Sequence, residues 1–457
     1  MIYRSKTMAN LRNAALISLA LVSAQAGAAV SEEEAAKLGK ELTPMGAIKA
    51  GNESGEIPEW TGGYSTVPEG YRTGDPRPNP FADEEPLFSI TASNMDEYAD
   101  KLSEGQKLLL EKHSDTYRLD IYPTHRTASA PEWVYENTRK NATRAQSVLG
   151  GYAIENAYGG IPFPIPQTGA EVMWNHLLRW AGESVRYDNR INVVTASGSV
   201  SLASAVTNEM SFPYYFKDGS LDNFNGDFWH LYQVTTSPSF RAGETILIRD
   251  PLDQVNKGRQ AWQYLVGQRR VRRAPNIAYD TPNSVNSGVD FFDEVSMFLG
   301  ALDKYDWKIV EKKEMYIPYN MNEFYLHSEE EVLSPNHLNP DHMRWELHRV
   351  WVVEATLADG ERHSIPRKRF YVDEDTWAAM LYDGWDAQGT LWHSGQGVPF
   401  LAYEFPGQIM YPFMVYDHVK GSYQASVFNE SEVHYEKVDR YPEDNFTPAA
   451  LSSRGVR

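Results

Sequence analysis

The second half of the chain is dominated by short β-type runs that follow one another closely. From about residue 190 the sequence passes through INVVTASGSVSLASAV, DFWHLYQVTTSP, ETILIRD, AWQYLVGQRRVRRAP, WKIVEKKEMYIP and RWELHRVWVVEATL, and then through RKRFYVDEDTWAAMLYD and GTLWHSGQG. Turn signals at Lys217-Asp218-Gly219, Gly267 and Asp359-Gly360 predict tight hairpins between such runs. Consecutive strands joined by hairpins form an antiparallel sheet, so we expect a mainly β protein of the α+β class rather than a parallel α/β fold.

Two of these runs carry large apolar side chains on one face. In RWELHRVWVVEA, the alternation of a strand places Trp345, Leu347, Trp351 and Val353 on one side, and it places Glu346, His348 and Glu354 on the other, which we expect to face solvent. In AWQYLVGQRRV, Trp262 and Tyr264 precede the turn at Gly267. Such faces can wall an apolar interior that binds a ligand, or they can simply fill a core.

The segment GGIPFPIP, residues 159–166, has a backbone that cannot join the middle of a sheet. Its three prolines have no N–H to donate, which favours an extended, polyproline-like strap carrying Ile161, Phe163 and Ile165. Thr168 and Glu171 form a capping-box pattern that predicts a helix start. The apolar residues that follow at helical spacing are Met173, Leu177 and Trp180.

The region 30–190 is predicted to be an extension of helices and ordered coil. Helices are expected over SEEEAAKLGKEL, with Ser31 as cap, over DEYADKLSEGQKLLLEKH, with Asn94 and Glu97 as caps, and over APEWVYENTRKNATRAQSVL. The passages between them are rich in glycine and proline. We therefore expect one domain over 30–457, with its β-rich core at 190–457.

The first 29 residues have the pattern of a signal peptide. Arg4, Lys6 and Arg12 precede the short apolar run AALISLALVSA, and the small residues AQAGAA then offer cleavage sites after Ala28 or Ala29. No later stretch reaches the roughly 18 apolar residues of a membrane span. A chain without cysteine also has no lipid-anchoring cysteine and no disulfide. We expect an exported periplasmic protein without a lipid anchor.

The charge balance argues against several classes of partner. With 43 basic and 62 acidic residues the formal charge is −19, and removal of the three basic residues of the predicted signal peptide makes it −22. Such a protein is not expected to bind nucleic acid or to adsorb loosely to an anionic membrane. The 12 Trp, 27 Tyr and 18 Phe residues are a heavy aromatic load, which suits either a β-sheet core or an aromatic-lined groove.

One dense basic run, QRRVRRAP, interrupts this acidic chain. Arg269 and Arg273 alternate with Arg270 and Arg272, so both faces of a strand there would carry guanidinium groups. These groups could pair with the surplus acids, or they could contact an anionic head group or an acidic patch on a partner.

Motifs for covalent chemistry or metal binding are not apparent. His337, His342 and His348 lie close together in sequence, but their spacing matches neither H-E-x-x-H nor a standard zinc site. Ser197 and Ser394 lack the G-x-S-x-G pattern of a nucleophile elbow. Acid pairs are numerous, and sequence alone cannot place two of them across a cleft. We expect no catalytic residues, no metal and no cofactor.

Four stretches, taken in order, resemble a known family. They are VSEEEAAKLGKELTPMGAIKAGN with GEIPEWTGG, then YGGIPFPIP, then WQYLVGQRRVRRAP, and finally RFYVDEDTWAAM with GWDAQGTLW. They resemble a proteobacterial periplasmic family of unknown function that is often labelled outer-membrane lipoprotein-sorting protein and is related to the LolA/LolB/LppX carriers. The resemblance implies a strongly curved antiparallel half-barrel, closed by N-terminal helices and the Pro-rich strap over an apolar cavity.

The resemblance also implies a function. We expect a periplasmic carrier or chaperone that binds a hydrophobic small molecule, a lipid or a lipoprotein acyl chain, and that works with an inner-membrane exporter and an outer-membrane protein. Alternatives are a periplasmic hydrolase acting on glycan or lipid, and a structural adaptor of an export system. The residues predicted to form the cavity and its cover are Ile161, Phe163, Ile165, Met173, Leu177, Trp180, Trp262, Tyr264, Trp345, Leu347, Trp351 and Val353.

Overall fold

The computed structural model describes residues 30–455, so the predicted signal peptide at 1–29 lies outside the described part of the chain. The α-helices are α1 (Glu32–Ala35), α2 (Glu104–Lys112), α3 (Glu132–Arg144), α4 (Gly169–Leu177), α5 (Glu329–Val332) and α6 (Pro448–Gly455). The first ten strands are β1 (Phe88–Ile90), β2 (Leu119–Ile121), β3 (Gln146–Val148), β4 (Ala153–Glu155), β5 (Ser184–Val194), β6 (Val200–Ser211), β7 (Asp227–Ser237), β8 (Thr245–Pro251), β9 (Gln260–Leu265) and β10 (Arg270–Arg273). The remaining strands are β11 (Tyr305–Pro318), β12 (Trp345–Leu357), β13 (Arg367–Asp373), β14 (Ala379–Trp385), β15 (Leu391–Gly397), β16 (Phe400–Ala402), β17 (Gly407–Ile409), β18 (Phe413–Asp417), β19 (Ser422–Val427) and β20 (Glu436–Lys437).

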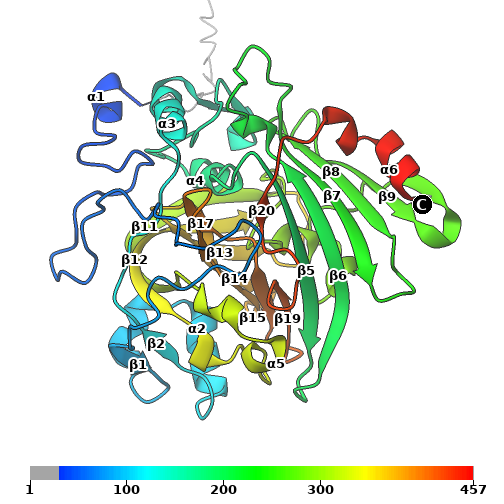
Figure 1. The fold of residues 1–457 in the computed structure, drawn as a ribbon. Coiled ribbons are helices and arrows are strands. Elements are labelled where there is room, and N and C mark those ends of the chain that lie inside the picture. The colour runs from blue at the N-terminus through cyan, green and yellow to red at the C-terminus, as the bar shows by residue number, and fades with distance from the viewer. Residues whose placement is uncertain (1–29, 456–457) are drawn as a thin grey trace, which may run out of the picture.

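One large sheet of 16 strands organises the molecule (Figure 1). Its order is β1-β2-β12-β13-β14-β15-β18-β19-β5-β6-β7-β8-β9-β10, with β11 beside β12 and β20 beside β5. The long neighbours are all antiparallel, and the short β2 meets β12 through a single parallel pair, Ile121 with Trp345. The prediction of an antiparallel sheet built mostly after residue 190 is confirmed. The sheet is not closed into a barrel, because its path ends at β1 and β10.

Two of the three predicted hairpin turns are present. Gly360, with a φ of 85°, lies in the connection from β12 to β13, and the turn at Gly267 joins β9 to β10. A turn is also present at Lys217-Asp218, where Gly219 N donates to the carbonyl oxygen of Phe216 at 3.0 Å, but it lies inside a long connection and does not form a tight hairpin. β6 ends at Ser211 and β7 begins at Asp227, and the long connection between them packs on Tyr158, whose hydroxyl donates to the carbonyl oxygen of Phe216 at 2.6 Å.

The predicted helices of the N-terminal region are present but shorter. α1 is a single turn whose Ser31 cap and Glu34 form a capping box. The helix predicted from residue 94 is divided, because Ser103 and Gln106 form a second capping box that starts α2, while 95–101 form a 3₁₀ turn. α3 covers the predicted APEWVYENTRKNATRAQSVL segment from Glu132 to Arg144.

The prediction that Glu346 and His348 face solvent is wrong. Both side chains of β12 are buried. The N-terminal coil covers the face that the alternation assigned to water, and the backbone N–H of His125 donates to Glu346 Oε2 at 2.8 Å. Two-residue alternation separates core from solvent only when one face of a sheet is open, and here both faces are covered. Glu354, nearer the end of the strand, is partly exposed and pairs with Arg367 and Arg369.

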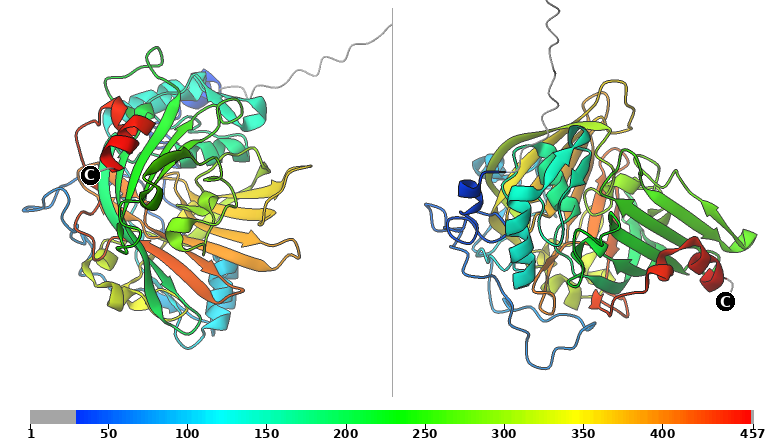
Figure 2. Two further views of the ribbon diagram at one scale, coloured as in Figure 1. Left: turned by 90° about the vertical axis from the view of Figure 1, so that its right-hand side faces the viewer. Right: turned by 90° about the horizontal axis from the view of Figure 1, so that it is seen from above.

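The two faces of the sheet are covered by different parts of the chain. α6 lies on one face of β8 and β9, close to the C-terminus (Figure 1). It buries a small cluster that includes Tyr232, Leu247 and Phe446. On the other face, the segment between β10 and β11 lies between the green strands β5–β8 and the yellow and orange strands β13–β18 (Figure 2). This second face holds the candidate site.

Candidate functional site

An apolar cavity lies between strands β5–β8 and the segment 283–299, which we call the covering segment. The empty space of the cavity is about 770 Å³ when its open mouth is included. The volume that the centre of a water molecule can occupy is about 90 Å³. The second value is the one comparable with reported site volumes, and it is below the roughly 300–1,000 Å³ of typical small-molecule sites, so the cavity is narrow. The lining residues are Tyr187, Asn189, Ile191, Asn208, Met210, Trp229, Leu231, Gln233, Ile246, Ile248, Arg259, Asn283, Val285, Asn286, Phe292, Val295, Ser296, Leu299, Tyr411, Phe413, Ser426 and Phe428.

The strand register places the wall residues of the cavity in rows. Met210 of β6 lies opposite Leu231 of β7, which lies opposite Ile248 of β8. Because these residues are paired across antiparallel strands, their side chains leave the sheet on the same face. The row gives the cavity a continuous aliphatic wall.

A polar row runs beside this aliphatic wall. Asn189 Nδ2 donates to Ser426 Oγ at 2.6 Å, Asn208 Nδ2 donates to Asn189 Oδ1 at 2.7 Å, and Gln233 Nε2 donates to Asn208 Oδ1 at 2.8 Å. The four side chains thus form one hydrogen-bonded ladder across β19, β5, β6 and β7. Because the amides satisfy one another, this wall can face an apolar ligand at little desolvation cost.

Trp229 adds an unused donor to the cavity lining. Its side chain is 4 % exposed, and its indole N–H has no hydrogen-bond partner among the described residues. A buried donor without a partner costs free energy, on the order of 1–3 kcal/mol. A ligand that offers an oxygen acceptor to Trp229 Nε1 would remove this cost.

The charge at the cavity is neutralised within the protein. Arg259 Nε and Nη2 donate to Asp250 Oδ1 and Oδ2 at 2.8 and 2.7 Å, and Nη2 also donates to the carbonyl oxygen of Leu299 at 3.1 Å. The guanidinium therefore holds the covering segment and balances one carboxylate. It is not free to attract an anionic ligand.

Two buried carboxylates hold the covering segment on β13–β15. Asp293 Oδ2 accepts hydrogen bonds from Lys368 Nζ at 2.8 Å and from His363 Nε2 at 2.9 Å. Burial alone would raise the pKa of Asp293, but the charge on Lys368 and the bond from His363 together lower it below its ordinary value. The carboxylate is thus held ionised inside the core.

The neighbouring Glu294 makes the second attachment. Its Oε1 accepts hydrogen bonds from His393 Nδ1, at 2.8 Å, and from the Tyr382 hydroxyl. Burial opposes the charge on His393, but Glu294 and Asp417 raise the pKa of this histidine to about 9. At neutral pH the covering segment is therefore attached through ion pairs on both Asp293 and Glu294.

The predicted strap is part of the protein core. Ile161 and Phe163 are buried, and Asn175 of α4 binds the strap twice, accepting from Phe163 N at 3.0 Å and donating to Phe163 O at 2.7 Å. The helix begins at the predicted cap, where Thr168 accepts from Glu171 N at 3.2 Å. α4 touches the covering segment through His176, whose Nε2 lies 3.0 Å from the carbonyl oxygen of Phe298.

The structure places the predicted ligand-binding residues outside the lining of this cavity. α4 packs on β11 and β12, and the strap is bound to α4 through Asn175. Tyr264 belongs to the small cluster beneath α6, and Trp262 packs against that cluster. The residues of β12 and of the strap-and-helix unit that are part of the main core, or pack against it, are Ile161, Phe163, Met173, Leu177, Trp180, Trp345, Leu347, Trp351 and Val353. Ile165 is half-buried.

The sequence predicts the strand DFWHLYQV but does not distinguish the residues that line the cavity. Its alternation puts Trp229, Leu231 and Gln233 on one face. Asn189 and Asn208, together with Gln233, have the polarity of solvent-facing positions. Amide side chains recurring on several predicted strands are the sequence signal that could have indicated this wall of the cavity.

A second hollow lies at the surface between β4 and the start of β7. The volume that the centre of a water molecule can occupy is larger there than in the cavity, about 490 Å³, but the hollow is open to solvent. Charged residues such as Asp222, Asp253 and Lys257 line it. It has no enclosing wall. The cavity over β5–β8 is the better candidate for a ligand because it is covered and mainly apolar.

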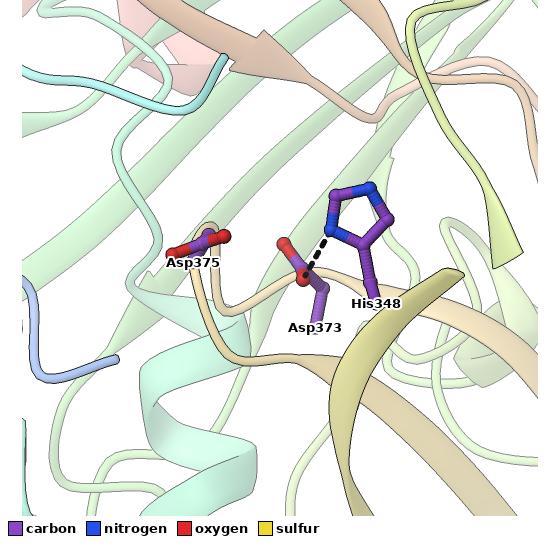
Figure 3. A group of neighbouring side chains, drawn as sticks. All are labelled: His348, Asp373 and Asp375. Carbon is purple, nitrogen blue, oxygen red and sulfur yellow. Dashed lines mark ion pairs between the residues drawn. The ribbon is translucent and has the colours of Figure 1, made fainter. Parts of the chain in front are cut away.

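His348, Asp373 and Asp375 are buried close together and resemble a metal-ligand group (Figure 3). Asp375 is already occupied, since Arg126 Nε and Nη2 donate to its two oxygens at 2.8 and 2.7 Å. Burial and the charge of Asp375 raise the pKa of Asp373 to about 6. With Asp375 paired to a guanidinium, only His348 and Asp373 can offer ligand atoms, which is fewer than a stable zinc site needs.

Ser394 and His418 form a buried pair away from the cavity. Ser394 Oγ lies 2.8 Å from His418 Nε2. Burial lowers the pKa of His418 to about 3, which makes it a weak base. Neither residue lines the cavity.

Taken together, these features define a mainly β protein with a large sheet, not closed into a barrel, that carries a covered apolar cavity. Residues 89–452 match the family model described as "Protein of unknown function (DUF1329)", and the chain belongs to that family, as its motifs predicted. The uncharacterized protein PA3922 of Pseudomonas aeruginosa is 41 % identical over 466 residues, covering 99 % of this chain and 100 % of that protein.

Two solved structures show weaker likeness. A DUF1329 family protein from Desulfovibrio piger has a TM-score of 0.39 and 13 % identity, covering 59 % of this chain and 92 % of its own. The LolA superfamily protein NE2245 from Nitrosomonas europaea has a TM-score of 0.36 and 11 % identity, covering 62 % and 98 %. We draw no functional conclusion from likeness at this level. Among residues 30–455, every helix is too short or too polar to cross a lipid bilayer.

Proposed function

We propose that this protein is a periplasmic carrier that holds a hydrophobic ligand in the cavity between β5–β8 and the covering segment. The observation that carries the proposal is the covered aliphatic wall, with Met210, Leu231 and Ile248 in one row. In this proposal residues 1–29 are a cleaved signal peptide and residues 30–457 form one domain. The sheet serves as a curved half-barrel around the ligand.

The chemistry of the lining favours carriage over catalysis. None of the residues that line the cavity is Asp, Glu, His or Lys, and the single Arg259 is neutralised by Asp250. General acid–base and nucleophilic catalysis need titratable groups that converge on a substrate. The proposed ligand is therefore bound without covalent change. The cavity also argues against a purely structural adaptor, whose interior would be filled by its own side chains.

The lining also describes the ligand. The proposed ligand is mostly apolar, is neutral where it is buried, and carries an oxygen atom that can accept a hydrogen bond from Trp229 Nε1. A lipid or a lipoprotein acyl chain with its ester or amide carbonyl has this chemistry. Transfer toward an outer-membrane protein or an inner-membrane exporter is the role that we propose for the complex.

A variant that fills the cavity tests the proposal. Gln233 is half-buried on the cavity face of β7, so Gln233→Trp places an indole in the cavity at a strand position that suits aromatic residues. Thr236 on the same strand is exposed and lines no part of the cavity, so Thr236→Trp is a matched control. We expect Gln233→Trp to lower binding of a fluorescent acyl probe at least tenfold, and Thr236→Trp to leave it unchanged. Equal probe binding by both variants and the parent protein would place the ligand elsewhere.

A further inference from the structure

Two neighbouring hairpin turns form a projecting tip at the β10 end of the sheet. The turn 238–244 joins β7 to β8, and the turn 266–269 joins β9 to β10. They lie side by side, because Thr245 pairs with Tyr264 across β8 and β9, and a methyl group at Gly243 would lie 3.1 Å from Val266 Cγ2. This end of the sheet projects on the right in Figure 1. We call residues 238–244 together with 266–273 the hairpin tip.

The hairpin tip exposes apolar side chains to solvent. Phe240 is 83 % exposed, more than any other large apolar residue of the described chain, and Val266 in the second turn is 39 % exposed. An exposed aromatic ring at the end of a turn contributes nothing to the core. It is free to enter another apolar phase.

The same tip carries cationic groups that the protein leaves free. Arg269, Arg270, Arg272 and Arg273 are exposed, and none of them forms an ion pair with any residue between 30 and 455. This is notable because the chain has 62 acidic residues against 43 basic ones. The pairing with surplus acids that the sequence allowed is therefore not made. The only other charges of the tip, Arg241 and Glu244, neutralise each other at 3.0 Å.

Arginines on an edge strand have a simpler use, since charge discourages pairing with the edge of another molecule. β10 is such an edge, because it ends the path of the sheet. That use does not explain Phe240, because an exposed aromatic ring beside an edge promotes the association that the charges prevent. The combination of free guanidinium groups with a projecting ring needs a partner that is both anionic and apolar.

We propose that the hairpin tip docks this protein on an anionic lipid surface, with Phe240 entering the interface and the four arginines contacting lipid head groups. A bilayer offers anionic head groups next to an apolar interior, so it can accept both kinds of exposed side chain. An acidic protein is a poorer match, since two hairpin turns offer far less than the roughly 800 Å² that a stable interface buries on each partner.

Docking through this tip would connect the membrane with the cavity. β7 and β8 supply both features, because Gln233 of β7 lines the cavity and Phe240 follows seven residues later. An extended strand rises about 3.3 Å per residue, so the two positions are at most roughly 23 Å apart. This is within the reach of an acyl chain leaving the membrane. The docking proposal stands without the cavity, since exposure and charge alone support it.

Flotation of the purified protein with lipid vesicles tests the proposal. We expect binding to vesicles of phosphatidylcholine mixed with phosphatidylglycerol, weakened by salt, and little binding to phosphatidylcholine alone. Each arginine near an anionic surface contributes about fivefold to affinity. The variant Arg269→Gln/Arg270→Gln/Arg272→Gln/Arg273→Gln should therefore lose about a hundredfold or more, and Phe240→Ser about tenfold.

The matched control lies at the other end of the same strands. Val255 is 48 % exposed in the turn between β8 and β9, and Lys257 is exposed beside it. Val255→Ser/Lys257→Gln should bind vesicles as the parent does, with thermal unfolding showing that every variant is folded. Equal binding by parent and tip variants, or equal binding to both lipid mixtures, would overturn the proposal, as would binding to acidic proteins but not to vesicles. The cavity-filling Gln233→Trp should leave vesicle binding intact, which separates this proposal from that of ligand carriage.

Discussion

Loss of the Lys368 ammonium should destabilise the protein strongly, because this group neutralises a carboxylate inside the core. Lys368 Nζ lies 2.8 Å from Asp293 Oδ2, and the two side chains are 1 % and 2 % exposed. Lys368→Met keeps the length of the side chain and removes the charge. Asp293 would retain only His363 as a partner, and its Oδ1 has no hydrogen bond among the described residues even in the parent.

The size of the effect follows from the burial of the pair. Breaking a buried ion pair by removing one partner costs about 3–5 kcal/mol, because the other charge stays buried without compensation. Replacing both partners with neutral groups is far less costly. We therefore expect Lys368→Met to lower the free energy of unfolding by about 3–5 kcal/mol, and Lys368→Met/Asp293→Asn to recover most of that loss.

Urea unfolding followed by circular dichroism measures both effects. Lys107 and Glu104 form a surface pair at 3.1 Å, so Lys107→Met is the control and should cost less than about 1 kcal/mol. Limited proteolysis adds a local readout, since the covering segment should be cut sooner in Lys368→Met than in the parent. A loss below about 1 kcal/mol in Lys368→Met, or no recovery in the double variant, would refute the reasoning that Asp293 holds this segment through a buried charge.

Three further predictions follow from the site and the strap. The folded-state pKa of His393 is raised to about 9, so its contribution to stability is complete below the unfolded pKa of about 6.5 and is lost as pH rises through 9. Unfolding free energy should therefore fall mainly between about pH 6.5 and 9 in the parent and less steeply in His393→Gln. Trp229→Phe keeps the ring and removes the N–H, so calorimetry should show an affinity loss of about threefold to tenfold for a fatty acyl ester and none for an alkane of equal length. Phe163→Asp places a carboxylate in the core, so the protein should unfold or melt far earlier, and a well-folded variant that lost only its ligand would show instead that the strap is a removable cover.

Features that depend on neighbouring residues were predictable from the sequence. The turns at Gly267 and Asp359-Gly360 follow from local chemistry, and so do the helix start at Thr168 and the short strands after residue 190. The proline strap was correctly kept out of the sheet, since no strand is formed by 159–166. The family also followed from motifs that are continuous in the chain.

Features that depend on distant packing were not predictable in the same way. The burial of Glu346 and His348 results from the N-terminal coil, more than 200 residues away in sequence, that covers their face of β12. The attachment of the covering segment joins Asp293 to Lys368 and Glu294 to His393, across 75 and 99 residues. Alternation within one strand contains no information about such pairs.

The cavity shows the same limit. Asn189, Asn208 and Gln233 become one ladder only through the register of β5, β6 and β7, and each residue alone is typical of a solvated strand face. The large aromatic residues that drew attention, such as Trp345 and Trp180, instead fill the core. Their size predicts burial well and ligand contact poorly.

Mass spectrometry of the ligand tests the central claim most directly. The protein should be purified without detergent, examined in its native state, and then extracted with organic solvent, beside Gln233→Trp prepared in the same way. The proposal predicts a bound neutral lipid or acyl compound in the parent and much less of it in Gln233→Trp, whose cavity is filled. A parent protein that carries no such compound, and that binds no acyl probe after solvent extraction and refolding, would contradict the proposal that this cavity carries a hydrophobic ligand.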